Sequence, residues 1–185
     1  MNYFLIFLSL FILRNIIEMV VSKKIVKQNR YRDINISNIT LLVFVVAYFY
    51  ANFIVIYRLS IETPNLYLFV IGIFFVVLSY IGRLYALYSM GEKSLSQNID
   101  IPNDSQLVTT GAFKIVRNPL YLFYALEIFS LLWMIQDWTL LLLAVINLVN
   151  TFVRIPIEEK KLTDRFGQKY IEYKNSTKRL IPFVY

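Results

Sequence analysis

The sequence predicts an all-α, multi-pass membrane protein of about five transmembrane helices, the last two forming a short hairpin that is followed by a cytoplasmic amphipathic helix. Of the 185 residues, 58% are hydrophobic and 17% are charged, whereas a soluble domain carries about 25% charged residues. The apolar residues gather in runs close to the length of a membrane span. Basic residues gather in alternate connections between these runs.

The first three spans are the clearest. A spanning helix needs about 20 mostly apolar residues, and Tyr3–Val21, Ile39–Tyr57 and Leu66–Tyr85 meet this requirement. No basic residue precedes the first run, and Arg14 and Glu18 interrupt it, which is atypical of a cleaved signal peptide. These two residues are spaced i, i+4, so they can pair on one face of the helix.

The last two spans, Leu120–Ile135 and Trp138–Val153, are shorter. Only Gln136 and Asp137 separate them, so we expect a tight antiparallel hairpin of helices. A carboxylate, Glu127, lies inside the first of the two spans. Acids within a span are functional candidates by default, because a buried charge is costly in hydrocarbon.

An amphipathic helix is expected after Pro156, which suits the first turn of a helix because its missing N–H needs no partner there. Apolar residues at i, i+4, i+8 and i+11 then form one stripe. They are Leu162, Phe166, Tyr170 and Tyr173. Glu158 lies one turn before this stripe on the same face. A carboxylate there needs a partner such as Arg154, or a hydroxyl or ammonium group of a ligand.

The distribution of basic residues predicts the orientation. Residues 22–38 hold five Lys and Arg, residues 89–119 hold three, and the region after Val153 holds eight. Residues 58–65 hold one base and one acid, and the hairpin turn has only Asp137. The positive-inside rule therefore places the amino terminus outside and the carboxyl terminus in the cytoplasm. The same distribution explains the net charge of +7, so no nucleic-acid partner is expected.

The residue types that are missing narrow the chemistry. The chain has no cysteine and no histidine, which excludes disulfides, thiolate ligands and the commonest general base. We therefore predict no metal site. The chain also lacks the glycine-rich motifs of nucleotide-binding loops. Residues 1–185 are expected to form a single integral-membrane domain, with three spans in 1–88 and the polar clusters in 89–185.

The first polar cluster is Val116-Arg117-Asn118-Pro119-Leu120-Tyr121. Pro119 suits the first turn of the fourth span, where unpaired N–H groups can receive an anionic ligand group, helped by Arg117 and Asn118. The alternative is an ordinary helix start with an interfacial Arg and Tyr. Taken alone, this cluster favours the alternative.

The second polar cluster is Arg154 with the adjacent acids Glu158 and Glu159. Carboxylates in a first helical turn are stabilised by the helix dipole. Arg154 can also extend from the end of the fifth span toward water. The apolar face on which Glu158 projects favours a functional interpretation.

Together these residues resemble the isoprenylcysteine carboxyl methyltransferase family, which belongs with the phospholipid methyltransferases. The family signature runs L-V-T-x-G, R-H-P-x-Y, a helical hairpin, R-x-x-x-E-E, L, F-G-x-x-Y-x-x-Y and a late proline. The matching residues are Leu107, Val108, Thr109, Gly111, Arg117 to Tyr121, Arg154, Glu158, Glu159, Leu162, Phe166, Gly167, Tyr170, Tyr173 and Pro182. The match begins near Gly82 and covers a little over half of the chain.

The resemblance implies a membrane methyltransferase that uses S-adenosylmethionine. In the family, the loop before the R-H-P motif, that motif and the E-E motif surround the cofactor. The implied cofactor-binding residues are Gln97, Ser105, Gln106, Leu107, Val108, Phe113, Arg117, Asn118, Pro119, Leu120, Tyr121, Glu158 and Glu159. Arg154 stands at the position linked to the carboxyl end of the substrate, so Arg154 and Glu158 are the implied catalytic residues. Residues 89–185 would then comprise a cofactor-binding loop, the hairpin and a carboxyl-terminal helix.

Three residues depart from the family pattern. Asn118 replaces the motif histidine, and its amide can donate a hydrogen bond but cannot carry charge. Phe113 stands where the family has tyrosine and lacks the hydroxyl. Phe123 replaces the glycine that often follows the motif tyrosine, which predicts a narrower mouth of the hairpin.

The resemblance favours carboxyl methylation of an isoprenylcysteine-like or other amphiphilic, lipid-linked substrate that enters sideways from the bilayer. A carboxylate is already ionised at neutral pH, so it needs no general base, which suits a chain without histidine. Arg154 would pair with it. The alternatives are an amine or thiol methyltransferase of the same fold, an NADPH-dependent membrane reductase with a comparable R-H-P-x-Y motif, and a non-catalytic membrane scaffold.

Overall fold

A computed structural model describes residues 2–25, 36–90 and 106–184 of the chain. Its elements are α1 (Tyr3–Ile25), α2 (Ile36–Ile61), α3 (Leu66–Met90), the short 3-10 helix η1 (Gly111–Lys114), α4 (Pro119–Ile135), α5 (Trp138–Phe166) and α6 (Gln168–Ser176). Within these described ranges there is no strand, only an isolated parallel bridge between Val116 and Lys178. The all-α class predicted from the sequence is confirmed.

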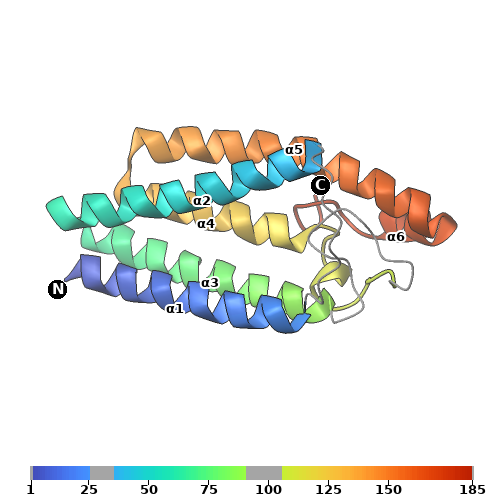
Figure 1. Ribbon diagram of the computed structural model, residues 1–185, viewed down its shortest axis with the longest axis horizontal. Helices are drawn as coiled ribbons and strands as arrows, with labels where there is room; N and C mark the ends of the chain where they lie inside the picture. Colours follow the sequence, from blue (N-terminus) through green and yellow to red (C-terminus); the bar gives the residue numbers. More distant parts are fainter. Residues whose placement is uncertain (1, 26–35, 91–105, 185) are drawn as a thin grey trace.

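Four helices, α1, α2, α3 and α5, are long and apolar enough to cross a membrane. The fifth expected span, α4, has 17 residues and is therefore about 25 Å long, somewhat shorter than a hydrocarbon layer. It lies in the same bundle, between α2 and α5 on one side and α1 and α3 on the other (Figure 1). A multi-pass membrane bundle follows, with α4 as its shortest member.

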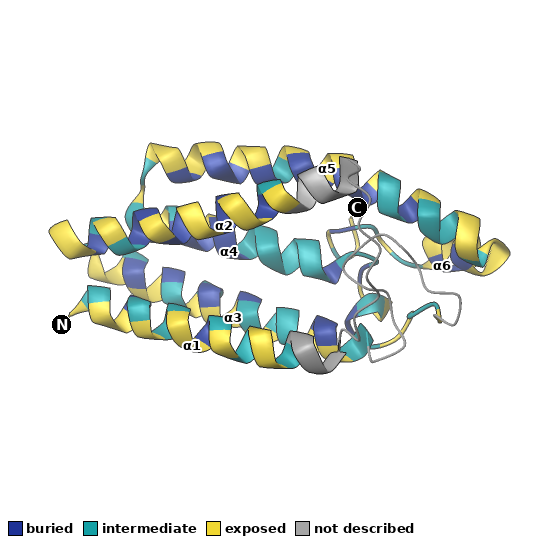
Figure 2. Cartoon of the chain, in the orientation of Figure 1, coloured by how far each residue is buried: buried dark blue, intermediate teal, exposed yellow. Residues whose placement is uncertain are grey.

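The bundle buries a core on its inward faces and leaves its outer faces apolar. Ala51, Val55, Phe69, Leu131 and Leu140 are buried at its centre. Figure 2 shows exposed residues along the outward faces of the long helices, and many of them are large and apolar. In water such a surface would be unfavourable, but in a bilayer it faces lipid.

The expected end of the fifth span is wrong. α5 does not stop at Val153 but continues through Pro156 to Phe166, so Pro156 lies inside a helix rather than in a first turn. An interior proline costs about 3 kcal/mol through a lost hydrogen bond and a clash. The helix continues because its inward face remains packed on both sides of the proline, where Ile155 and Glu159 are buried.

The expected single amphipathic helix is also divided in two. Gly167 ends α5 with φ +56°, in a region that favours glycine, and α6 begins at the next residue. Leu162 and Phe166 therefore belong to α5, whereas Tyr170 and Tyr173 belong to α6. The turn at Gly167 folds α6 back, so that Tyr173 donates a hydrogen bond to the carbonyl of Phe113 at 2.6 Å.

Candidate functional site

The first polar cluster is held by a strap, residues 178–180, that runs alongside it. The backbone N–H of Arg117 donates to the carbonyl of Lys178 at 2.8 Å, and that of Asn118 donates to the carbonyl of Arg179 at 3.1 Å. The side-chain amide of Asn118 donates to the same Arg179 carbonyl at 2.9 Å. Asn118 is thus the residue before the first turn of α4, as expected, but its side chain binds the strap instead of capping the helix.

Glu159 joins three segments at this end of the bundle. Its Oε1 accepts a hydrogen bond from Arg117 Nε at 3.0 Å, and its Oε2 pairs with Arg179 Nη2 at 3.1 Å. The Arg117 guanidinium also donates to the backbone carbonyls of Lys174, at 2.9 Å, and Thr177. Glu159 is buried. These contacts tie α5, the loop before α4 and the strap together, and we call them the Glu159 clamp.

Glu158, the neighbouring acid, has different partners. Its Oε1 accepts a hydrogen bond from the Tyr121 hydroxyl at 2.6 Å and from Arg154 Nε at 2.7 Å. The Arg154 side chain is only 4% exposed, whereas the Glu158 side chain is 24% exposed. The partner that the apolar face required is therefore Arg154, and solvent or a ligand can still reach the Glu158 carboxylate.

The segment before α4 rests on the end of α3. The N–H of Ala112 in η1 donates to Ser89 Oγ at 3.2 Å. Gly111 has φ +62°, and a Cβ there would overlap the Ser89 side chain, so this turn requires glycine. Burial raises the pKa of the Tyr173 phenol, which therefore stays protonated and keeps donating to Phe113. This contact uses the backbone carbonyl of Phe113, so it does not need the hydroxyl that the tyrosine of the family pattern would carry at this position.

The structure places the remaining sequence-predicted residues unevenly. Gln97 and Ser105 lie outside the described residues. Gln106, Leu107 and Val108 lie in the segment before η1, which has no regular secondary structure. Pro119 and Leu120 form the first turn of α4, with Pro119 at the expected position. The Tyr121 ring packs against Phe44 of α2, with ring centroids 5.6 Å apart.

One charged cluster was not anticipated from the sequence as a unit. Glu127 of α4 pairs with Arg14 of α1 and lies 3.9 Å from Arg83 of α3, while Glu18 of α1 pairs with both arginines. The Arg14 guanidinium also lies over the Tyr48 ring at 4.7 Å. We call Arg14, Glu18, Arg83 and Glu127 the intramembrane ion cluster, which carries two positive and two negative charges. Equal numbers of opposite charges inside the spans were the signal available in the sequence.

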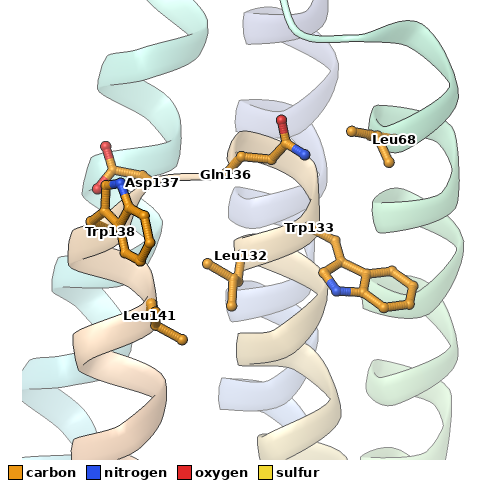
Figure 3. A pocket seen from close by; sticks show the side chains of 7 residues that line it. All are labelled: Leu68, Leu132, Trp133, Gln136, Asp137, Trp138 and Leu141. Atoms are coloured by element: carbon orange, nitrogen blue, oxygen red, sulfur yellow. The ribbon is translucent and has the colours of Figure 1, made fainter.

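A separate cavity lies at the opposite end of the bundle, beside the turn between α4 and α5 (Figure 3). Its volume is about 410 Å³, and it is lined by Leu68, Leu132, Trp133, Gln136, Asp137, Trp138 and Leu141. The Asp137 carboxylate is used to cap α5, accepting from the N–H of Thr139 at 2.8 Å. Apolar walls and exposed tryptophans suit the membrane boundary, and we assign no chemistry to this cavity.

Comparison with known proteins decides the family. The family model described as phospholipid methyltransferase matches residues 67–169, more than half of the chain. The chain belongs to the phospholipid methyltransferase family. The matched region runs from α3 to the start of α6 and contains Tyr121, Arg154, Glu158 and Glu159. The spans α1 and α2 precede it.

Two curated relatives are methyltransferases. The protein-S-isoprenylcysteine O-methyltransferase of Saccharomyces cerevisiae is 34% identical over 125 residues, covering 62% of this chain and 49% of the yeast protein. The methanethiol S-methyltransferase 1 of Bradyrhizobium diazoefficiens is 35% identical over 71 residues, covering 38% of this chain and 24% of that protein. This chain thus spans less than half the length of either relative.

Proposed function

We propose that this protein is an integral-membrane methyltransferase that uses S-adenosylmethionine to methylate the carboxylate of an amphiphilic or lipid-linked substrate. The observation that carries the proposal is the arrangement of Tyr121, Arg154 and Glu158, a partly exposed carboxylate held by the buried Arg154 and the half-buried Tyr121 where α4 and α5 meet. The family and the yeast relative support the reaction class and the lipid-linked acceptor.

The residues present fit a cationic cofactor. S-adenosylmethionine carries an ammonium and a sulfonium group, and it supplies the activated methyl group. The accessible Glu158 carboxylate suits the ammonium, since a hydrogen bond between charged groups is about twice as strong as a neutral one. Tyr121 and Arg154 hold the Glu158 side chain in one rotamer, so binding of the cofactor costs little side-chain conformational entropy. Arg117 and Glu159 support this site by holding the loop in place.

Arg154 is the residue we assign to the substrate carboxylate. Arg154 lies at the Glu158 site, where its Nε binds the Glu158 carboxylate, and the planar fork of a guanidinium matches a substrate carboxylate for bidentate pairing. That pairing would orient the acceptor for an in-line displacement. A carboxylate gives up no proton in this reaction, so the residues around it need only align it and exclude water.

A thiol acceptor is the second candidate, and the Bradyrhizobium relative favours it. A thiol must lose a proton before it attacks, so this reaction needs an acceptor such as Glu158. The two candidates differ in their dependence on pH. Turnover of a thiol substrate would rise with pH as the thiolate forms, whereas turnover of a carboxylate substrate would be flat above about pH 6.

Cofactor binding tests the proposal directly. We expect the detergent-purified protein to bind S-adenosylmethionine with micromolar affinity, and Glu158→Gln to weaken binding about 10- to 100-fold by removing a charged hydrogen-bond partner. Glu172→Gln, which neutralises an exposed acid on α6, is the matched control. A folded wild type that binds NADPH instead would indicate a reductase, and one that binds neither cofactor would indicate a scaffold.

We further propose that the end of the bundle bearing Glu158 is cytoplasmic, because the basic connections lie at that end. The chain has no cysteine, so single cysteines report accessibility without background. In intact cells an impermeant maleimide should label Glu62→Cys, in the connection after α2, and should not label Lys169→Cys on α6. Labelling of Lys169→Cys but not of Glu62→Cys would show the opposite orientation.

A further inference from the structure

Exposed apolar side chains are concentrated in one short segment beyond the spanning helices. Within residues 181–184, the side chains of Phe183, Val184 and Ile181 are 92%, 72% and 48% exposed. Leu180, immediately before them, is buried. On the spans, exposed apolar residues face lipid, but this segment lies outside the spans and needs another explanation.

The position of this segment is fixed by the start of α4. The carbonyl of Arg179 accepts hydrogen bonds from both the backbone and the side chain of Asn118, the residue before α4. α4 has 17 residues, about 25 Å, which is less than the thickness of the hydrocarbon layer. A helix of this length that crosses the layer has both ends close to its boundaries, and the polar Arg117 and Asn118 just before it favour the water-facing side, so we place its first turn at the membrane boundary. Residues 181–184 begin two residues after Arg179, so the segment starts close to this level.

The segment is folded so that it projects an aromatic ring. The N–H of Val184 donates to the carbonyl of Ile181 at 3.2 Å, which closes a turn. Pro182 occupies the second position of the turn, which proline favours, and Phe183 occupies the third with φ +66°. That third position normally selects glycine or asparagine. A phenylalanine held there, with its ring almost fully exposed, indicates that the ring itself has a use.

We propose that Ile181–Val184 is a lipid anchor whose side chains insert at the boundary between headgroups and acyl chains of the membrane that the bundle spans. Aromatic and aliphatic side chains at this depth are favourable, since aromatic residues concentrate at membrane interfaces. Lys174 and Lys178, which are exposed nearby, suit anionic headgroups. The anchor would hold the strap, and through it Arg117, Asn118 and the Glu159 clamp, at a fixed depth. This inference does not depend on methyl transfer.

Fluorescence depth measurements test the anchor. A single Phe183→Cys variant carrying an environment-sensitive fluorophore is reconstituted in nanodiscs, with and without lipids brominated near the top of the acyl chain. Val149→Cys, on the exposed face of α5, is the control inside the membrane. Lys169→Cys, exposed in the first turn of α6, is the control in water, because the turn between α5 and α6 lies beyond the end of the bundle (Figure 1). Val184→Cys, which keeps the phenylalanine, repeats the test with the anchor intact.

The anchor predicts that the probes at positions 183 and 184 are blue-shifted relative to the probe at 169 and at least 2-fold quenched by brominated lipid. Spectra like those of Lys169→Cys, with no quenching, would overturn the proposal. A blue shift without bromine quenching would overturn it as well, because that result would place the segment against protein, such as a second copy of the chain.

Discussion

Two ionic clusters in this molecule use the same residue types in different surroundings. The Glu159 clamp, beside the start of α4, joins one acid to two arginines, and Arg117 also donates to backbone carbonyls. The intramembrane ion cluster lies within the spans, where Arg14 Nε, Arg83 Nε and Glu127 Oε2 have no hydrogen-bond partner among the described residues. A charge inside a span is therefore not in itself a sign of catalysis, because here it holds α1 against α3 and α4.

Glu158 differs from the acids of both clusters. Glu159 and Glu127 are buried and each contacts two arginines, whereas Glu158 contacts one arginine and one tyrosine and stays partly exposed. A carboxylate whose neighbours fully neutralise it stabilises the fold. A partly exposed carboxylate can bind a ligand. We therefore propose that Glu158 binds a ligand and that its neighbour Glu159 supports the fold.

Removing Glu127 should have the largest effect. Glu127→Leu removes the buried acid that pairs with Arg14 and leaves Arg14 and Arg83 to share Glu18, and removing one partner of a buried pair costs about 3–5 kcal/mol. We expect a large fall in the unfolding temperature in detergent. Glu62→Leu, which breaks the exposed pair between Arg58 and Glu62, is the matched control and should cost less than about 1 kcal/mol. Equal effects of the two substitutions would show that the cluster does not hold α1.

Glu159→Gln tests the clamp and should have the next largest effect. The amide cannot satisfy two arginines, so we expect a loss of about 1.5–3 kcal/mol in the free energy of unfolding, the range for hydrogen bonds to charged groups. Glu158→Gln is the comparison, since it should lower stability less while weakening cofactor binding more. Unfolding and cofactor titration of both variants would measure the difference. A Glu158 variant less stable than the Glu159 variant would contradict this division.

The sequence predicted the spans but not how they are rotated. Long apolar runs located α1, α2 and α3 to within a few residues, because hydrocarbon thickness fixes their length. Pro156 was placed in a first turn because local rules exclude it from helix interiors, and the packing of Ile155 and Glu159 outweighed those rules. Arg154 was expected as a partner of Glu158, but sequence alone could not show that Glu159, which points about 100° away around the helix, pairs with Arg117 and Arg179.

The packing between α3 and α4 lies between the Glu158 site and the intramembrane ion cluster. The Phe123 ring lies against Gly82, where a Cβ would overlap it. Phe123, expected to narrow the mouth, therefore packs on α3, between Tyr121 and Glu127 along α4. Gly82→Ala should cost about 1–3 kcal/mol by overpacking and should also weaken cofactor binding by moving Tyr121.

The control for Gly82→Ala is the double variant Gly82→Ala with Phe123→Ala, in which the overlapping ring is absent. The double variant should unfold at a higher temperature than the sum of the two single effects predicts. Strictly additive unfolding free energies would show that the contact between Gly82 and Phe123 does not couple α3 to α4.

Substitution of Asp137, at the turn between α4 and α5, should have the smallest effect on stability. Asp137 caps α5 through Thr139 and lies 3.5 Å from Arg58 Nε. Hydrogen bonds from Thr139 hold the pKa of the Asp137 carboxyl below its ordinary value of 3.8. A lowered pKa in the folded state stabilises the protein above the unfolded pKa, and this stabilisation is lost as pH falls through the folded pKa.

Asp137→Ala should therefore cost about 1 kcal/mol at neutral pH, the usual value of a cap. The gap to the wild type should narrow only below about pH 4. Asp164→Ala, an exposed acid late in α5, is the control and should leave the unfolding temperature unchanged between pH 7 and pH 5. A gap between Asp137→Ala and the wild type that is already closed at pH 5 would show that Asp137 is not held ionised by Thr139.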